Sequence, residues 1–184
     1  MGFIRKLCGV AVSTVLAAGA VVAVSPAAFA APPGYFKIQN TFSNMCLDIS
    51  GNQTTRKGRA IQTYCLDDPA QFWRWGVAPR EDPNALVNLN SQLCLWPNEG
   101  RVRDVQYVEQ WDCLPTHSAQ RWQIYKEDHA KVVRSFDSNF VLSVHAPTDT
   151  AGSRVMLYHF HGHKTLDQYW RIHCESAIPV CPGD

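Results

Sequence analysis

After residue 30 the hydrophobic positions of the chain come in short groups. Segments of four to six residues rich in valine, isoleucine, leucine and aromatic residues alternate with segments of asparagine, glycine, aspartate and proline. No sustained spacing of three and four residues gives a helix an apolar face, and short apolar runs bounded by turn residues are typical of β-strands. The pattern therefore predicts an all-β domain.

Three similar units follow one another, at about 35–80, 81–127 and 128–173. Each ends in Gln-x-Trp, and these motifs begin at residues 71, 120 and 168, so they are 49 and then 48 residues apart. The units also share a start (43–49, 91–96, 138–144) and a middle segment that ends in an aromatic ring (61–64, 108–111, 155–158). Propeller blades have a similar period but need at least about four copies. Three copies favour a closed threefold barrel with the motif tryptophans in its core.

The N-terminus has a different composition. Arg5 and Lys6 precede an apolar run from residue 7 to 24, and residues 28–30 form an Ala-Phe-Ala cleavage site. A retained membrane anchor is the alternative, because the run approaches the length that spans a bilayer. We expect residues 1–30 to be a cleaved signal peptide, of a style typical of a bacterial, actinobacterial-looking export signal. Residues 31–184 are then a secreted domain.

Removing this segment leaves a nearly neutral chain. Two of the 17 basic residues are lost and all 16 acidic residues stay, so the net charge becomes 15 − 16 = −1. Nucleic acids and anionic membranes bind to clustered lysine and arginine, which the sequence lacks. We expect no nucleic-acid partner and no membrane insertion.

Six of the seven cysteines remain after cleavage, which suits an oxidising compartment. Six cysteines formally permit fifteen pairings. In the first two units the cysteines are equally spaced, since 65 − 46 and 113 − 94 are both 19. This predicts the disulfides Cys46–Cys65 and Cys94–Cys113. By elimination, Cys174–Cys181 closes a C-terminal tail at 174–184.

Cys-Leu-Asp-Ile at 46–49, Ile-Gln-x-aromatic at 61–64 and three Gln-x-Trp motifs together resemble the ricin B-type (R-type) β-trefoil lectins, from about residue 35 to 173. The resemblance implies a β-trefoil that binds carbohydrate and needs no cofactor. In that family a binding lobe presents a carboxylate to the sugar hydroxyls and an aromatic ring to the apolar face of the sugar. Polar amides complete the site.

In the first lobe the resemblance gives each of these roles to a residue. Asp48 is the carboxylate, Gln62 and Tyr64 are the Gln-x-aromatic pair, and Gln71 is the supporting glutamine. Ala70 departs from the usual asparagine, and Asp67 or Asp68 would have to replace it. The alternative role for Asp48 is to cap the turn at 50–52, which aspartate favours on its own account.

The other two lobes depart further from the family pattern. The second has Trp96 for the carboxylate and Ala119 for the asparagine, keeps Trp111 as the ring, and offers Glu109 as a substitute acid; packing beneath a loop is the favoured interpretation of its tryptophans. The third has Ser143 for the carboxylate and Met156 for the glutamine. A different ligand geometry there would use Tyr158, His161 and Asp167.

Metal binding and catalysis find little support. His159, His161 and His163 alternate, as a zinc or copper site would allow, but no acid or thiolate lies at a fixed offset, so we expect no metal. Motifs of hydrolases and phosphate loops do not occur, and Asp67 and Asp68 beside Asp48 do not make a glycosidase pair. The basic turn at 56–59 is the one candidate for a protease-inhibitor loop.

The sequence thus predicts a secreted lectin, not an enzyme, that recognises galactose-like or related cell-surface glycans as a targeting module, chiefly through the first lobe. The alternative is a protein-interaction or targeting subunit of a secreted multi-chain toxin assembly, with degenerate sugar sites. Its partner would be another secreted protein chain, and the two functions are compatible because assembly supplies the multivalency that weak sugar sites need.

Overall fold

The computed structural model describes residues 32–127, 130–146, 148–162, 166–174 and 181. The predicted signal peptide, His163 and most of the predicted tail lie outside these residues. The described chain forms twelve strands in one sheet, joined by loops and short 3-10 turns, so the all-β prediction is confirmed. No helix of the described residues is long and apolar enough to cross a membrane.

Four strands make up each lobe. The first lobe contains β1 (Phe36–Asn40), β2 (Cys46–Ile49), β3 (Ala60–Thr63) and β4 (Trp73–Trp75); the second contains β5 (Leu86–Asn88), β6 (Cys94–Pro97), β7 (Gln106–Trp111) and β8 (Trp122–Glu127); the third contains β9 (Ala130–Ser135), β10 (Phe140–Val144), β11 (Val155–His159) and β12 (Trp170–Cys174). A 3-10 turn precedes the last strand of each lobe: η2 (Pro69–Gln71), η4 (Ser118–Gln120) and η6 (Leu166–Gln168).

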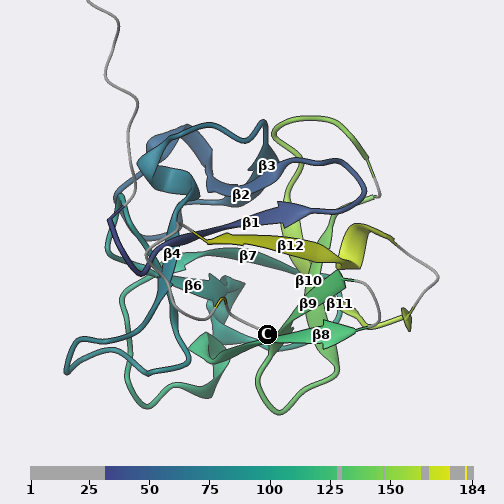
Figure 1. The fold of residues 1–184 in the computed structure, drawn as a ribbon. Coiled ribbons are helices and arrows are strands. Elements are labelled where there is room, and N and C mark those ends of the chain that lie inside the picture. Colours follow the sequence, from purple (N-terminus) through teal and green to yellow (C-terminus); the bar gives the residue numbers. More distant parts are fainter. Residues whose placement is uncertain (1–31, 128–129, 147, 163–165, 175–180, 182–184) are drawn as a thin grey trace, which may run out of the picture.

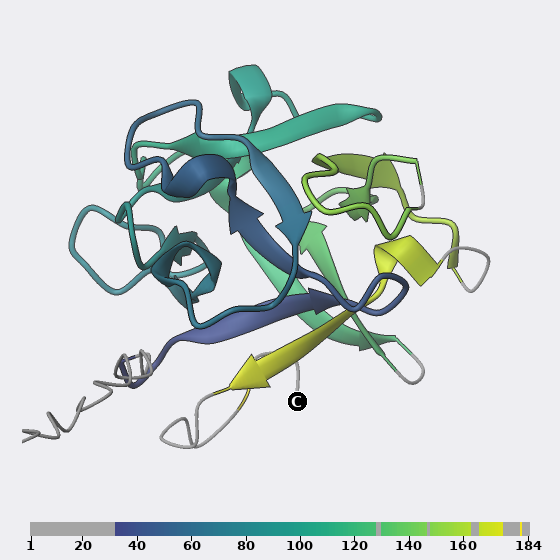
Figure 2. The same ribbon diagram turned by 90° about the horizontal axis from the view of Figure 1, so that it is seen from above.

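The first and last strands of the lobes form a closed ring. Its order is β1, β4, β5, β8, β9 and β12, and β12 pairs antiparallel with β1 to close it (Figures 1 and 2). Between β5 and β8 the link is the single bridge Ala85–Arg121. The middle strands form three hairpins, β2–β3, β6–β7 and β10–β11. This is the closed threefold barrel that the repeats predict and the β-trefoil that the family resemblance implies.

The three motif tryptophans occupy equivalent places in the core. Trp73, Trp122 and Trp170 have no exposed area. Their indole N–H groups donate to the carbonyl oxygens of residues 47, 95 and 142, at 3.3, 3.2 and 3.0 Å. A buried indole needs such an acceptor. The tryptophans are therefore core residues that fasten the last strand of each lobe to its hairpin, as the repeats predict.

The motif glutamines also have a structural role. The Nε2 groups of Gln71, Gln120 and Gln168 donate to the carbonyl oxygens of residues 64, 112 and 159, at 2.9, 2.6 and 2.8 Å. Their Oε1 atoms accept from the backbone N–H of residues 66, 114 and 161. Each glutamine side chain thus makes one donated and one accepted hydrogen bond to the backbone at the end of its hairpin, as a neighbouring strand would.

The structure contains disulfides Cys46–Cys65 and Cys94–Cys113, which the spacing predicts, and Cys174–Cys181, which is predicted by elimination. The first two join β2 or β6 to the end of the neighbouring strand, with Cα atoms 5.0 and 5.1 Å apart. In the third lobe Val141 and Phe160 stand at the equivalent positions and belong to a small apolar cluster with Tyr169. The third lobe therefore replaces a covalent link by side-chain packing.

Candidate functional site

The strand register decides which side chains share a face in each lobe. Cys46 lies opposite Thr63, Cys94 opposite Trp111, and Val141 opposite Tyr158. Thr63 is therefore the equivalent of Trp111 and Tyr158. The sequence alignment of the first lobe was wrong by one residue.

This shift removes the aromatic ring from the predicted first-lobe site. Asp48 lies opposite Ile61, so Asp48, Ile61 and Thr63 share one face of the β2–β3 hairpin. Tyr64 is the next residue after Thr63, and successive side chains of an extended strand point to opposite faces. Its side chain is 66% exposed. Tyr64 is not placed to form a face of the same site as Asp48.

Asp48 itself is a buried carboxylate. It is 5% exposed, and its Oδ2 accepts a hydrogen bond of 2.7 Å from Nε2 of Gln71. The pKa of Asp48 is raised to about 6, chiefly because the carboxyl is buried; the Gln71 hydrogen bond opposes this rise and the nearby Asp68 adds to it. Asp68 caps the η2 turn by accepting from the Ala70 N–H. The first lobe thus keeps an acid and its supporting glutamine but has a threonine, Thr63, at the ring position.

Gln62 has a structural role, contrary to the sequence prediction of a sugar contact. Its side chain has no exposed area. Nε2 donates to the carbonyl oxygens of Thr148 and Thr150, at 2.8 and 3.2 Å, while Oε1 accepts from the Ser43 hydroxyl at 2.7 Å. Its amide is fully used in holding a loop of the third lobe against the first. Gln110 holds the loop at 53–55 in the same way.

In the second lobe, tryptophans line a hollow of about 510 Å³. Trp96 and Trp111 lie nearly parallel, with ring centroids 6.3 Å apart, and Trp96 also packs edge-on against His117. Glu109, opposite Trp96 on β7, is buried and accepts from Nδ2 of Asn98 at 2.8 Å. Trp96 fills the place where the first lobe has its carboxylate.

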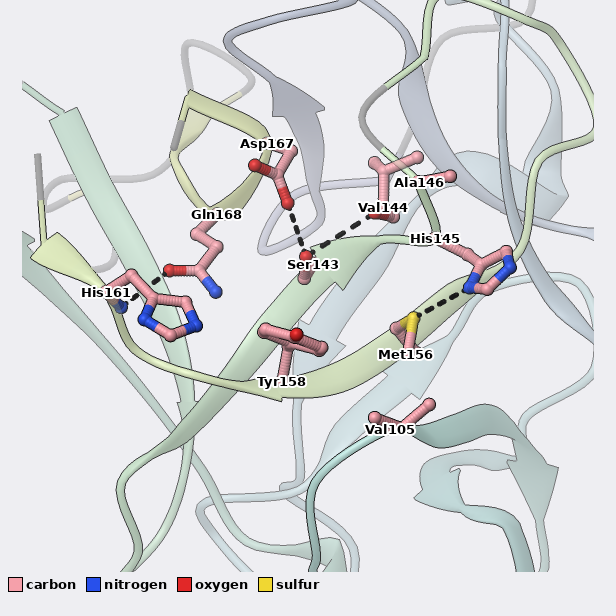
Figure 3. Close-up of a pocket in the computed structure, with 10 residues that line it drawn as sticks. All are labelled: Val105, Ser143, Val144, His145, Ala146, Met156, Tyr158, His161, Asp167 and Gln168. Atoms are coloured by element: carbon pink, nitrogen blue, oxygen red, sulfur yellow. Dashed lines mark hydrogen bonds between the residues drawn. The ribbon is translucent and has the colours of Figure 1, made fainter. Parts of the chain in front are cut away.

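The third lobe has a cavity of about 490 Å³ at the same hairpin face (Figure 3). Ser143 comes from β10, and Met156 and Tyr158 come from β11. Asp167 and Gln168 come from the η6 turn. The remaining lining residues are Val105, Val144, His145, Ala146 and His161. The cavity therefore combines an aromatic ring, a hydroxyl and a carboxylate.

Asp167 is the most constrained polar group of this cavity. Its carboxylate is 5% exposed, and Oδ2 accepts a 2.5 Å hydrogen bond from the Ser143 hydroxyl. The other oxygen, Oδ1, is buried without a hydrogen-bond partner and points away from Ser143 in Figure 3. The backbone of the turn is fixed, since the Asp167 carbonyl accepts from Nδ2 of Asn40 at 2.8 Å. One carboxylate oxygen is thus held in place and still lacks a donor.

Two histidines of this lobe, His145 and His161, line the cavity. The His161 ring lies 5.4 Å from the Tyr158 ring and 5.9 Å from the His159 ring, measured between centroids. His163 lies outside the described residues. No group of three histidine, cysteine, aspartate or glutamate side chains suited to a metal ion occurs in the described part of the chain.

The structure brings together three third-lobe residues that the sequence names separately. Tyr158, His161 and Asp167 line one cavity, and Ser143 joins them through its hydrogen bond to Asp167. A sequence signal for the first-lobe error existed: Trp111 stands two residues before Cys113, whereas Tyr64 stands directly before Cys65.

The profile of the family described as the ricin-type beta-trefoil lectin domain matches residues 34–170. A search of curated proteins gave no significant match. Among solved structures, the designed threefold-symmetric protein ThreeFoil has a TM-score of 0.68 and 22% identity, covering 77% of this chain and 99% of its own.

Two natural lectins are also similar. The Macrolepiota procera ricin B-like lectin, solved with lactose, has a TM-score of 0.63 and 20% identity, covering 79% of this chain and 99% of its own. The C-half of the earthworm R-type lectin, solved with GalNAc, has a TM-score of 0.61 and 15% identity, covering 78% and 100%. At these identities the likeness shows the fold. The family match covers most of the described residues. The chain therefore belongs to the ricin-type β-trefoil lectin family, and this membership supports a role in carbohydrate binding.

Proposed function

We propose that this protein is a secreted lectin that binds galactose-like or related glycans through its third lobe, as a binding protein and not an enzyme. The observation that carries the proposal is that Asp167, whose carboxylate Oδ1 has no hydrogen-bond partner, and Tyr158 line the same cavity. The proposal moves the primary site from the first lobe, where the sequence placed it.

The cavity offers the two contacts that a pyranose needs. The Asp167 carboxylate can accept hydrogen bonds from sugar hydroxyls, and a bond to a charged acceptor contributes roughly 1.5–3 kcal/mol. The Tyr158 ring supplies flat apolar area with few rotatable bonds to freeze. The hydroxyl of Ser143 holds the Asp167 carboxylate in place, so this side chain loses little conformational freedom when a ligand binds.

The two natural lectins that share the fold support this sugar class. One was solved with lactose, which contains galactose, and the other with GalNAc, its N-acetylated amine. Secretion is supported by the export-type N-terminus and by three disulfides, which form in oxidising compartments. A single sugar site binds weakly, so the protein would act on surfaces that display many copies of the glycan.

A glycan array tests the proposal. Residues 31–184 are compared with Asp167→Asn and with Asp48→Asn, a matched substitution of the first-lobe acid. We expect the wild type and Asp48→Asn to bind galactose-terminated glycans and Asp167→Asn to lose at least tenfold in affinity, because an amide cannot replace a charged acceptor. Circular dichroism checks the fold of each variant. Equal binding by Asp167→Asn, or no glycan bound by the wild type, would contradict the proposal.

A further inference from the structure

One edge of strand β8 is open. β8 pairs with β9 along its whole length, from Trp122 to Glu127. On its other side the bridge at Arg121 and a 2.8 Å hydrogen bond from the Trp122 N–H to the Asn84 carbonyl are the last links to the β5 segment. Backbone groups alternate in direction along a strand, so Ile124 and Lys126 direct their N–H and C=O groups to the same side as Trp122. Within the described ranges nothing pairs with them there.

The two other lobes cover this position. Trp75 in β4 and Ile172 in β12 are the equivalents of Ile124, because each stands two residues after its motif tryptophan. The Trp75 carbonyl accepts a 3.0 Å hydrogen bond from the Arg74 guanidinium. The Sγ atom of Cys181 lies 3.6 Å from the Ile172 carbonyl oxygen, so this residue lies beside β12. In the third lobe Cys181 thus lies against an edge of this kind.

A hollow of about 390 Å³ follows the open edge. Trp122 and Ile124 border it from the inner face of β8, and Trp75 lies with them. Gln123 and Tyr125, which alternate with the inward-pointing residues, border it from the outer face. Because both faces of the strand contribute, the hollow runs along the backbone edge. One side of it is apolar and aromatic.

The other side of the hollow carries a positive charge that pairs with no acidic side chain among the described residues. The guanidinium of Arg134, on β9 opposite Gln123, lies 4.5 Å from the Tyr125 ring centroid and 5.9 Å from that of Phe160. Its Nε and the Tyr125 hydroxyl are buried without hydrogen-bond partners. Among the described residues Arg134 forms no ion pair, whereas Arg121 is paired with Asp82. A carboxylate is the group that complements Arg134.

We propose that the open edge of β8 binds an extended segment of a partner protein by strand addition, with apolar side chains facing Trp75 and Ile124 and acidic side chains facing Arg134. Main-chain hydrogen bonds to Ile124 and Lys126 give the affinity, and the two faces of the hollow give the preference for alternating apolar and acidic residues. This surface is separate from the third-lobe cavity and does not depend on sugar binding.

The test uses the capped peptide acetyl-Glu-Val-Glu-Val-Glu-amide and amide NMR spectra of residues 31–184. We expect the Ile124 and Lys126 amides to shift at about 1 mM peptide and to exchange more slowly with solvent. Lys126→Pro removes one N–H that points away from β9, so the β8–β9 ladder stays intact. Relative to Lys126→Ala, which also lacks the charge, it should bind about tenfold more weakly.

Further variants separate the outcomes. Arg134→Gln should weaken the peptide about fivefold while Tyr158→Ala leaves it unchanged. Binding should vanish when alternate peptide nitrogens are methylated. Unperturbed Ile124 and Lys126 amides, or equal affinity of Lys126→Pro and Lys126→Ala, would overturn the proposal. Self-association of the free protein that Lys126→Pro abolishes would also overturn it, because the occupant would then be a second copy.

Discussion

The first and third lobes have the same hairpin and the same 3-10 turn, but the carboxylate comes from the hairpin strand in the first lobe and from the turn in the third. In the first lobe Asp48 lies on the strand, and the partner in the turn is Gln71, at 2.7 Å. In the third lobe the acid is Asp167 in the turn, and the partner on the strand is Ser143, at 2.5 Å. The difference shows that an acid can be supplied from either side, while the residue type opposite Cys46 or Val141 decides whether a ring stands beside it.

The ring position separates the two lobes functionally. Thr63 and Tyr158 occupy equivalent places opposite Cys46 and Val141. A threonine there offers no flat apolar area to a sugar, so the first lobe keeps a well-supported acid in an incomplete site. The third lobe has the ring and the acid together, and that combination is why we place the primary site there.

The lobes also differ in how they are held together, and removing the first-lobe disulfide should have the largest effect on stability. Cys46 and Cys65 are 19 residues apart, and the double variant Cys46→Ala with Cys65→Ala should lower the free energy of unfolding by about 3 kcal/mol on the chain-entropy account. Urea unfolding followed by tryptophan fluorescence measures this. A loss below about 1 kcal/mol would mean that packing already holds the first lobe, as Val141 and Phe160 hold the third.

Removing the third-lobe ring should have the next largest effect. Tyr158→Ala should weaken glycan binding at least tenfold, about 1.4 kcal/mol, because the stacking surface is lost. Tyr64→Ala is the matched control, since the sequence placed that ring in a site and the register does not. Titration calorimetry gives both affinities. If Tyr64→Ala loses binding and Tyr158→Ala does not, our assignment of the two lobes is reversed.

The charged Asp48 side chain should lower the free energy of unfolding at neutral pH. Burial raises the pKa of Asp48 to about 6 in the folded protein, above its unfolded value near 4. The folded state therefore binds more protons between these values, and the free energy of unfolding falls as the pH rises through them. Asp48→Asn removes this penalty, so it should stabilise the protein by about 1–2 kcal/mol at pH 7 and by nearly nothing below pH 4. A variant that is less stable at pH 7 would show that the charged form is favoured.

Adding the missing ring should have the smallest effect. Thr63→Tyr places an aromatic side chain on the face of Asp48, and we expect a weak second site, seen as a stoichiometry rising from one toward two sugars per chain. Avidity on a dense glycan surface should improve about two- to threefold. An unchanged stoichiometry would indicate that the Asp48 carboxylate is too fully engaged with Gln71 to accept sugar hydroxyls.

The threefold frame could be predicted from the sequence because its signals repeat. Three Gln-x-Trp motifs fix the same contacts in each lobe, two equal cysteine spacings fix a disulfide in the first two lobes, and all these contacts lie within one lobe. Gln62 could not be placed in this way, because its partners Thr148 and Thr150 belong to a loop of another lobe. A long-range contact of this kind leaves no local pattern.

The site was harder to predict than the fold for a further physical reason. In a strand, a slip of one residue moves every side chain to the opposite face, so the misplaced ring at Tyr64 changed the site while leaving the fold prediction intact. The hydrogen bond between Ser143 and Asp167 joins residues 24 positions apart. The sequence named both residues but could not show that they meet.

The most direct test of the central claim is an amide NMR titration of residues 31–184 with the best glycan from the array. We predict that the shifts gather at Ser143, Tyr158, His161 and Asp167, the residues around the third-lobe cavity. Shifts that gather instead at Asp48, Thr63 and Gln71 would contradict the account and return the site to the first lobe.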